Sequence, residues 1–119
     1  MSSYSQSSGQ VGGLFLDSSP TTFAQRLRLS ELATRHRLLS IGQGSQYKDA
    51  TLLAYGANNL DLWRRAATYV DKLLKGANPA ELPVEQPMKY DFTINLQIAR
   101  ALGLTIPESV LLQATEVIQ

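Results

Sequence analysis

Hydrophobic and polar positions alternate most clearly between Asn59 and Asn95. The first part of this region repeats apolar side chains at steps of three and four residues, which is the spacing of one helix face. These residues are Leu60, Trp63, Ala67, Val70 and Leu74. Asn58 and Asn59 provide capping oxygens at the start, and Gly76 suits the left-handed conformation that ends helices. The pattern predicts a helix from Asn59 to Lys75 or Gly76, with one face built to be buried.

A proline-punctuated connector follows this helix and leads into a strand. Three prolines within residues 77–89 fix the backbone and push each preceding residue towards extended geometry, which predicts a stiff strap. Residues 90–95 then alternate between apolar and polar side chains, with Tyr90, Phe92 and Ile94 on one face. Period-two alternation of this kind is typical of a strand with one buried face.

The first half of the chain reads as strand, helix, strand. The apolar run 11–16 ends at a serine and a proline that favour a helix start, and a broad apolar stripe predicts a helix from Thr21 to about His36. A second strand is expected at 38–41 and a third at 51–55. A β-α-β order favours parallel strands with a right-handed crossover. The predicted fold class is α/β, a three-layer sandwich with a mostly parallel sheet.

Two further helices are expected after the strand at 90–95. Leu96, Ile98, Ala99 and Leu102 have helical spacing, and Gly103 can end the short helix that they form. Pro107 is suited to the first turn of a final helix, which the pattern extends through Leu111 and Leu112 to Ile118.

Residues 69–107 resemble the C-terminal end of ABC-transporter substrate-binding proteins of the tryptophan-binding-protein-like family. The resemblance covers the helix, the Lys75-Gly76 stop, the Leu82-Pro-Val-Glu-Gln-Pro87 strap, the strand ending in Ile94-Asn-Leu96, and the following Ala101-Leu-Gly-Leu-Thr-Ile-Pro107. Weaker similarity extends back to about Gly12. The resemblance implies the fold of part of a type I periplasmic binding protein.

The resemblance also implies a function and a division of the chain. It implies binding of a small organic solute such as an amino acid by lobe closure, delivery to an ABC permease, and a periplasmic location. Residues 11–44 would be a second-lobe βαβ unit, 51–76 a strand and helix of first-lobe type, 77–89 the strap, and 90–119 a strand with the C-terminal helices. Family members are longer, so we expect a lone copy to form half a cleft, to bind weakly and to self-associate through the uncovered face of Trp63 and Val70.

Composition narrows the function classes. The chain has 119 residues, of which 44% are hydrophobic and 18% charged, which suits one globular domain. A formal net charge of +1 gives no field that would attract nucleic acid, and the arginines between Arg26 and Arg37 read as a solvated helix face. No apolar run approaches the roughly 20 residues that span a bilayer. Residues 1–10 are polar, so we expect them to be disordered and, lacking a secretory signal, to leave this chain in the cytoplasm if expressed as written.

Candidate chemistry is confined to solute binding. There is no cysteine and only one histidine, His36, so no metal site, cofactor or catalytic group is expected. Gly42-Gln-Gly44 lacks the third glycine of a phosphate-binding loop, and Ser18 and Ser19 lack a nucleophile elbow.

The polar residues that follow the strands are the best binding candidates. In open α/β sheets, ligands bind beyond the carboxyl ends of the strands, which points to Asp17, Ser18, Gln43 and Tyr55. Each of these side chains also suits an ordinary turn. Two other readings stay open: a flavodoxin-like or receiver-like interaction module with Asp17 as its acidic strand-end residue, and a truncated fragment that binds nothing.

Overall fold

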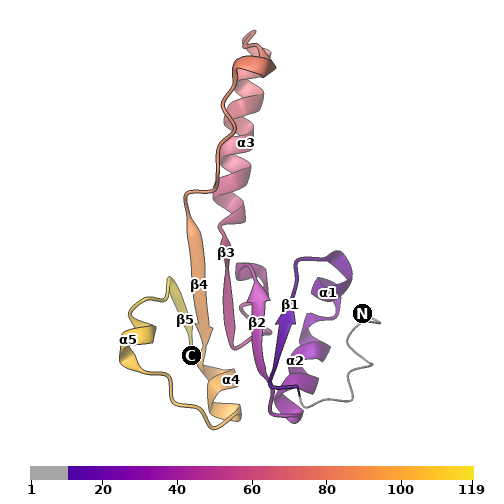
Figure 1. Cartoon of the computed structure of the whole chain (residues 1–119), viewed down its shortest axis with the longest axis vertical. Helices are drawn as coiled ribbons and strands as arrows, with labels where there is room; N and C mark the ends of the chain where they lie inside the picture. The colour runs from indigo at the N-terminus through magenta and orange to yellow at the C-terminus, as the bar shows by residue number, and fades with distance from the viewer. Residues whose placement is uncertain (1–10) are drawn as a thin grey trace.

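A five-stranded sheet forms the body of the molecule (Figure 1). The computed structural model describes residues 11–119, so the expectation for residues 1–10 lies outside the described residues. The strands are β1 (Gly13–Leu16), β2 (Leu39–Gln43), β3 (Leu53–Ala57), β4 (Tyr90–Asn95) and β5 (Glu116–Ile118), in that spatial order. All neighbouring pairs are parallel except β3 and β4. The predicted α/β class and mostly parallel sheet are confirmed.

The strand order also separates the fold from a doubly wound module. In flavodoxin-like sheets the chain reverses direction across the sheet, giving the order 2-1-3-4-5. Here the strands follow one another in sequence, and β4 runs antiparallel to β3. The flavodoxin-like and receiver-like reading therefore does not fit this sheet.

The helix predicted from Thr21 to His36 is two helices, α1 (Pro20–Ala24) and α2 (Arg26–Arg35), and the continuous helix was wrong. The predicted start is confirmed, because the Ser19 hydroxyl accepts a hydrogen bond from the Thr22 amide at 3.2 Å. Gln25 leaves helical geometry with φ −100° and ψ 10°. At this break the Arg26 guanidinium donates to the Phe23 carbonyl oxygen and pairs with Asp49, contacts that connect the junction to the loop after β2.

The C-terminal region contains the other correction. Helix α4 (Leu96–Ala101) begins as predicted, with the Asn95 side chain accepting from the amides of Gln97 and Ile98. The final helix, α5 (Glu108–Leu111), is only one turn, and the predicted extension to Ile118 is wrong because residues 116–118 form β5. The free edge of β4 supplies the pairing, starting where the Thr115 amide donates to the Phe92 carbonyl oxygen at 2.7 Å.

Buried side chains gather in two clusters at the sheet. One contains Leu16, Tyr47 and Ala54, with Leu14 and Leu29 of α2 packed against it. The other contains Leu52, Ala99 and Leu102 around α4. Tyr47 ends the short 3-10 helix η2 (Ser45–Tyr47) and has no exposed surface, and its hydroxyl donates to the Asp17 carbonyl oxygen at 2.7 Å. Tyr47 therefore ties the loop after β2 to the end of β1.

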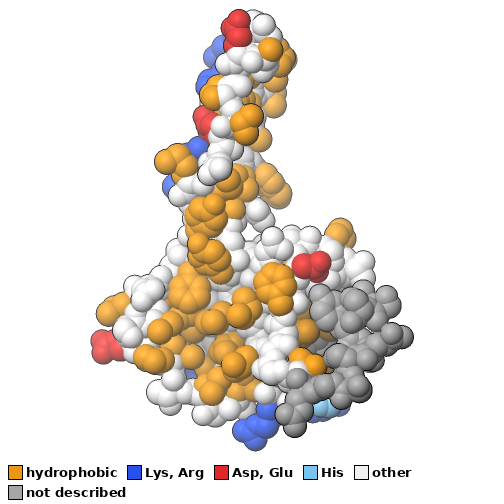
Figure 2. Space-filling model, in the orientation of Figure 1, with side chains coloured by type: hydrophobic (Ala, Val, Ile, Leu, Met, Phe, Trp, Pro, Cys, Tyr) orange, Lys and Arg blue, Asp and Glu red, His pale blue; other side chains and the backbone are white. Residues whose placement is uncertain are grey.

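The opposite side of the sheet is largely uncovered. The strand register places Phe15 beside Ile41 and Ile41 beside Leu53, and it places Tyr55 beside Phe92. Large apolar side chains on this side remain about half exposed, namely Phe15, Leu39, Ile41, Tyr55 and Tyr90. Figure 2 shows hydrophobic side chains spread over the front of the body. We call this surface the bare sheet face.

Helix α3 (Asn59–Leu74) and the returning residues 75–89 project from the sheet as an arm (Figure 1). The predicted ends are confirmed: the Asn58 side chain accepts from the Asp61 amide at 2.8 Å, and Gly76 has φ +98°. The strap contains one short 3-10 helix, η3 (Pro79–Glu81). No residue of α3 is buried, so the stripe built for burial lies open, with Trp63 71% and Leu74 84% exposed.

Candidate functional site

The carboxyl ends of β1 and β2 meet through three polar side chains. The Ser18 amide donates to Gln43 Oε1 at 3.1 Å. Gln46, in η2, donates from Nε2 to the Gln43 carbonyl oxygen at 2.9 Å and to Ser18 Oγ at 3.3 Å. Two of the sequence-predicted residues, Ser18 and Gln43, therefore lie together, and Gln46 joins them.

Two glycines allow this close approach. Gly44 has φ +97°, a conformation that side chains rarely adopt, and its amide donates to the Tyr55 carbonyl oxygen at 2.9 Å. A Cβ at Gly56 would lie 2.8 Å from the Gly44 Cα. The ends of β2 and β3 are thus closer than two larger residues would permit.

Asp17 lies beside α1. Its Oδ1 accepts from the Thr22 hydroxyl at 3.2 Å, and its backbone carbonyl oxygen accepts from the Tyr47 hydroxyl. Burial raises the pKa of Tyr47, and the nearby Asp17 carboxylate raises it further. These contacts give Asp17 a role in holding the first turn of α1, next to Ser18.

Tyr55 lies in an aromatic row on the bare sheet face. Its ring stacks on Tyr90 with centroids 5.8 Å apart and meets Phe92 edge to face at 6.4 Å. Its side chain is 56% exposed. Tyr55 therefore lies apart from the three clefts at the carboxyl ends of the strands, none of which it lines.

Three neighbouring clefts open at the carboxyl ends of the strands, with volumes of about 460, 440 and 140 Å³. Gln46 and Asn59 line all three, Ser18 lines two, and Trp63 lines the largest. Gln46 Oε1 is buried and has no hydrogen-bond partner among the described residues. Buried acceptors without a partner are rare in native structures, so Gln46 is a residue whose hydrogen bonding is incomplete. The clefts combine this acceptor with amide donors and one exposed indole.

Sequence reasoning missed Gln46 and Asn59 as site residues. The sequence pattern indicates Asn59 only as a capping residue of α3, although it lies two residues after the end of β3, within the region that the strand-end rule covers. Gln46 lies within a polar loop, and the chain alone does not indicate that η2 turns it back towards Ser18.

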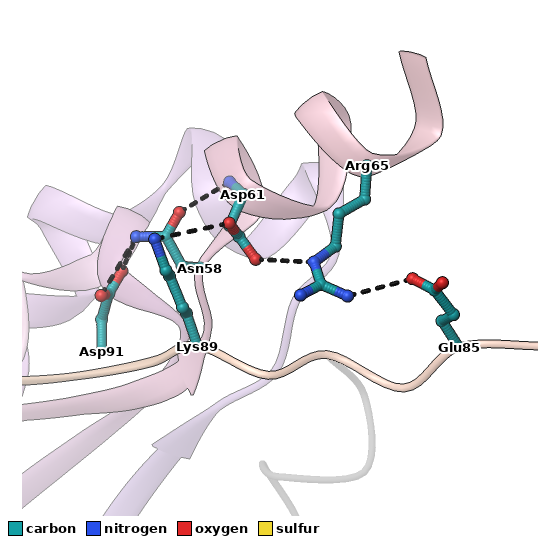
Figure 3. A network of polar contacts seen from close by, with 6 residues as sticks. All are labelled: Asn58, Asp61, Arg65, Glu85, Lys89 and Asp91. Carbon is teal, nitrogen blue, oxygen red and sulfur yellow. Dashed lines mark hydrogen bonds and ion pairs between the residues drawn. The ribbon is translucent and has the colours of Figure 1, made fainter. Parts of the chain in front are cut away.

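A polar network fixes the base of the arm against the sheet (Figure 3). Asn58 Nδ2 donates to both carboxylate oxygens of Asp91, at 3.2 and 3.0 Å, while its Oδ1 accepts from the Asp61 amide. Arg65 then bridges Asp61 at 3.2 Å and Glu85 at 3.0 Å. Lys89 Nζ lies 3.7 Å from Asp61 Oδ1. The network sets the direction in which α3 leaves β3. It therefore also sets the positions of Asn59 and Trp63, which line the clefts.

Residues 11–119 contain neither a cluster of metal ligands nor a helix that could span a membrane. Within this range, no group of three or more His, Cys, Asp or Glu side chains is placed to hold a metal ion. Over the same residues, no helix has both the length and the apolar composition needed to cross a membrane.

The sequence matches a family model over residues 39–118, which is more than half of the chain. The model describes the ABC transporter substrate binding proteins, and the chain belongs to this family. No curated protein matches the chain.

Solved structures share this fold. The ABC domain from Streptococcus pneumoniae, in complex with L-Trp, has a TM-score of 0.82 and 26% identity, and the match covers 92% of this chain and 37% of that one. A conserved domain protein from Vibrio cholerae has a TM-score of 0.81 and 25% identity, covering 89% and 36%. A ligand-free, open substrate binding protein with adhesive properties from Clostridium difficile supports the fold alone, at 19% identity, a TM-score of 0.64 and the same coverage as the Vibrio protein. The chain thus spans little more than a third of these structures.

Proposed function

We propose that this chain forms one wall of the solute site in a substrate-binding component of an ABC importer. The observation that carries the proposal is the set of three clefts at the carboxyl ends of β1 to β3, which share Gln46 and Asn59. Gln46 lines each of these clefts, and the hydrogen bonding of its buried Oε1 is incomplete among the described residues. Family membership supports transport of a small molecule as the setting.

The residues suit a small polar organic solute such as an amino acid. Gln46 Oε1 would accept from an ammonium or hydroxyl group, and the Asn59 side chain supplies both a donor and an acceptor. Trp63 offers a flat apolar surface at the largest cleft. Ser18 and Gln43 hold this wall in place, while Asp17 and Tyr55 flank it. The solute in the Streptococcus complex, L-Trp, is the first compound to test.

The mechanism we propose is closure of two walls around the solute, without covalent chemistry. The closed complex would then be presented to an ABC permease, with the periplasm as the site of action. This chain supplies one wall, and a solute held at about micromolar affinity by two walls would fall to roughly millimolar affinity with half of its contacts.

Calorimetric titration with L-Trp and a panel of amino acids and small organic acids tests the proposal. We expect binding in the roughly millimolar range that weakens about tenfold in Gln46→Ala and Asn59→Ala, because each removes a hydrogen bond at the wall. Gln86→Ala, at an exposed strap position away from the clefts, is the matched control and should bind as the parent does. The loss of affinity in four further variants ranks the residues predicted from sequence by their contribution to binding. These variants are Asp17→Ala, Ser18→Ala, Gln43→Ala and Tyr55→Ala.

Two results would contradict the proposal. Tight binding unchanged in Gln46→Ala and Asn59→Ala would place the solute elsewhere. No binding of any compound, with the parent chain folded by circular dichroism, would favour the alternative of a fragment without binding activity.

A further inference from the structure

Helix α3 has an apolar stripe that no other residue between 11 and 119 buries. Leu60, Trp63, Val70 and Leu74 lie on one side of the helix and are 62%, 71%, 54% and 84% exposed. The opposite side of α3 faces the returning strap, where the Tyr69 hydroxyl donates to the Pro83 carbonyl oxygen and Arg65 pairs with Glu85. The strap therefore lies along the Arg65 and Tyr69 side of the arm and leaves the apolar stripe open.

The bare sheet face also consists of exposed apolar side chains. Phe15, Leu39 and Ile41 are 54%, 46% and 43% exposed, and Tyr55 and Tyr90 are similarly open. A groove of about 310 Å³ runs between β1 and β2, lined by Gly12, Gly13, Leu14, Phe15, Leu39 and Ile41. The sheet positions that register places on this face carry no charged side chain, so covering it removes no ion from water.

The stripe and the bare face do not meet within one chain. Only Asn58 separates the end of β3 from the start of α3, so the helix continues outward from the strand that it follows. The network of Asn58, Asp61 and Asp91 holds it there. Figure 1 shows the arm pointing away from the sheet. Folding back onto its own face would require breaking that network.

The two surfaces match in size. Sixteen helical residues span about 24 Å, and four strands about 4.8 Å apart span roughly 15 to 20 Å. Aromatic side chains bury about 150 to 250 Å² each and aliphatic ones less, so each of these partly exposed surfaces offers on the order of 500 Å². Two such contacts bury roughly 2,000 Å² in total, which is enough for a stable dimer.

We propose that two copies of this chain form a two-fold dimer in which the arm of each copy lies across the bare sheet face of the other. The Val70 and Leu74 part of the stripe fills the groove between β1 and β2 of the second copy, and Trp63 stays at the largest cleft. The arrangement is reciprocal, so both apolar surfaces of both copies are covered and no open surface is left to propagate a filament.

Light scattering across a concentration series tests the dimer. We expect a mass of two chains at high concentration, with Val70→Asp raising the dissociation constant by at least about 30-fold, because it places a charge at the centre of an apolar contact. Thr68→Asp is the matched control, since it adds the same charge to an exposed position of α3 outside the stripe. It should dimerise as the parent does. Both positions are exposed, so circular dichroism should show equal folding.

Disulfide trapping tests which surfaces meet. The chain has no cysteine, so the only thiols are those introduced. Ile41→Cys and Val70→Cys variants, one carrying a mass tag, are mixed and oxidised. We expect the main product to be the mixed disulfide, which joins position 41 of one chain to position 70 of the other. A product joining only two copies of Val70→Cys would mean that arms pair with arms and would overturn the proposal. A monomer at every concentration would overturn it as well.

Discussion

The body and the arm of this molecule follow the same sequence rules but reach opposite degrees of burial. In the body, Tyr47, Ala54 and Ile94 have no exposed surface. In the arm, α3 has no buried residue, although its apolar residues repeat more regularly than those of α2. Amphipathic spacing specifies the side of a helix on which burial would occur. The presence of a surface to cover that side depends on the rest of the molecule.

The two regions also differ in what holds them together. The body is stabilised by removing apolar side chains from water, at about 25 cal/mol per Å². The arm depends on the network at its base and on exposed ion pairs such as Lys75 with Asp71, and surface pairs contribute only about 0 to 1 kcal/mol each. An isolated helix of this length is marginal in water. The outer arm should therefore be the least stable part of a monomer.

The largest expected effect contrasts one aromatic residue from each region. Tyr47→Ala should destabilise the chain by about 3 to 5 kcal/mol, because it leaves a cavity beside Leu16 and Ala54 and removes the bond to the Asp17 carbonyl oxygen. Trp63→Ala should change stability by less than about 0.5 kcal/mol in dilute monomer, because Trp63 is already mostly exposed. Urea unfolding at low concentration measures both. Equal losses would mean that the stripe is covered within one chain.

An intermediate effect is expected at the junction of the two regions. Asn58→Ala removes the cap of α3 and the contact with Asp91, which should cost about 1 kcal/mol and speed amide exchange in the first turns of the helix. Asn78→Ala is the control, because Asn78 also caps a helix, the 3-10 turn at the far end of the arm, but does not touch the sheet. Equal exchange profiles in the two variants would show that the base network does not set the position of α3.

Local signals predicted the parts of the fold that depend on local structure. The ends of α3 follow from the capping oxygen of Asn58 and the left-handed conformation of Gly76, which neighbouring residues alone determine. The period-two pattern of β4 likewise needed no distant partner. The break at Gln25 could not be predicted, since it adjoins the contact between Arg26 and Asp49, 23 residues away. Residues 116–118 form a strand because β4 offers an edge there.

In the candidate site too, some residues could be predicted from local sequence and others depend on distant contacts. The strand-end rule indicated Ser18 and Gln43, and the structure brings these two residues into contact. It did not indicate Gln46, whose place beside them depends on the turn of η2 and on the approach of Gly44 to Gly56. Contacts between loops that are far apart in the sequence depend on how the sheet assembles, so local sequence patterns do not predict them.

The smallest expected effect compares a tyrosine of the body with one of the arm at alkaline pH. Burial, and then the Asp17 carboxylate, raise the pKa of Tyr47 above its usual value near 10. Desolvation, and then Glu85, raise the pKa of Tyr69. A raised pKa in the folded chain means that the stabilising neutral form is fully present below about pH 10, and that stability falls as pH rises through the folded pKa.

We therefore expect the urea midpoint to be constant from pH 8 to about pH 10 and to fall above it. Tyr47→Phe should have a lower midpoint throughout, because it lacks the hydrogen bond to the Asp17 carbonyl oxygen. Its decline above pH 10 should be shallower than that of the parent, because a phenyl ring has no proton to lose. Tyr69→Phe should leave the decline nearly unchanged, since loosening the exposed arm hardly alters the body. A decline that depends on Tyr69 instead would mean that the arm and the body unfold as one unit.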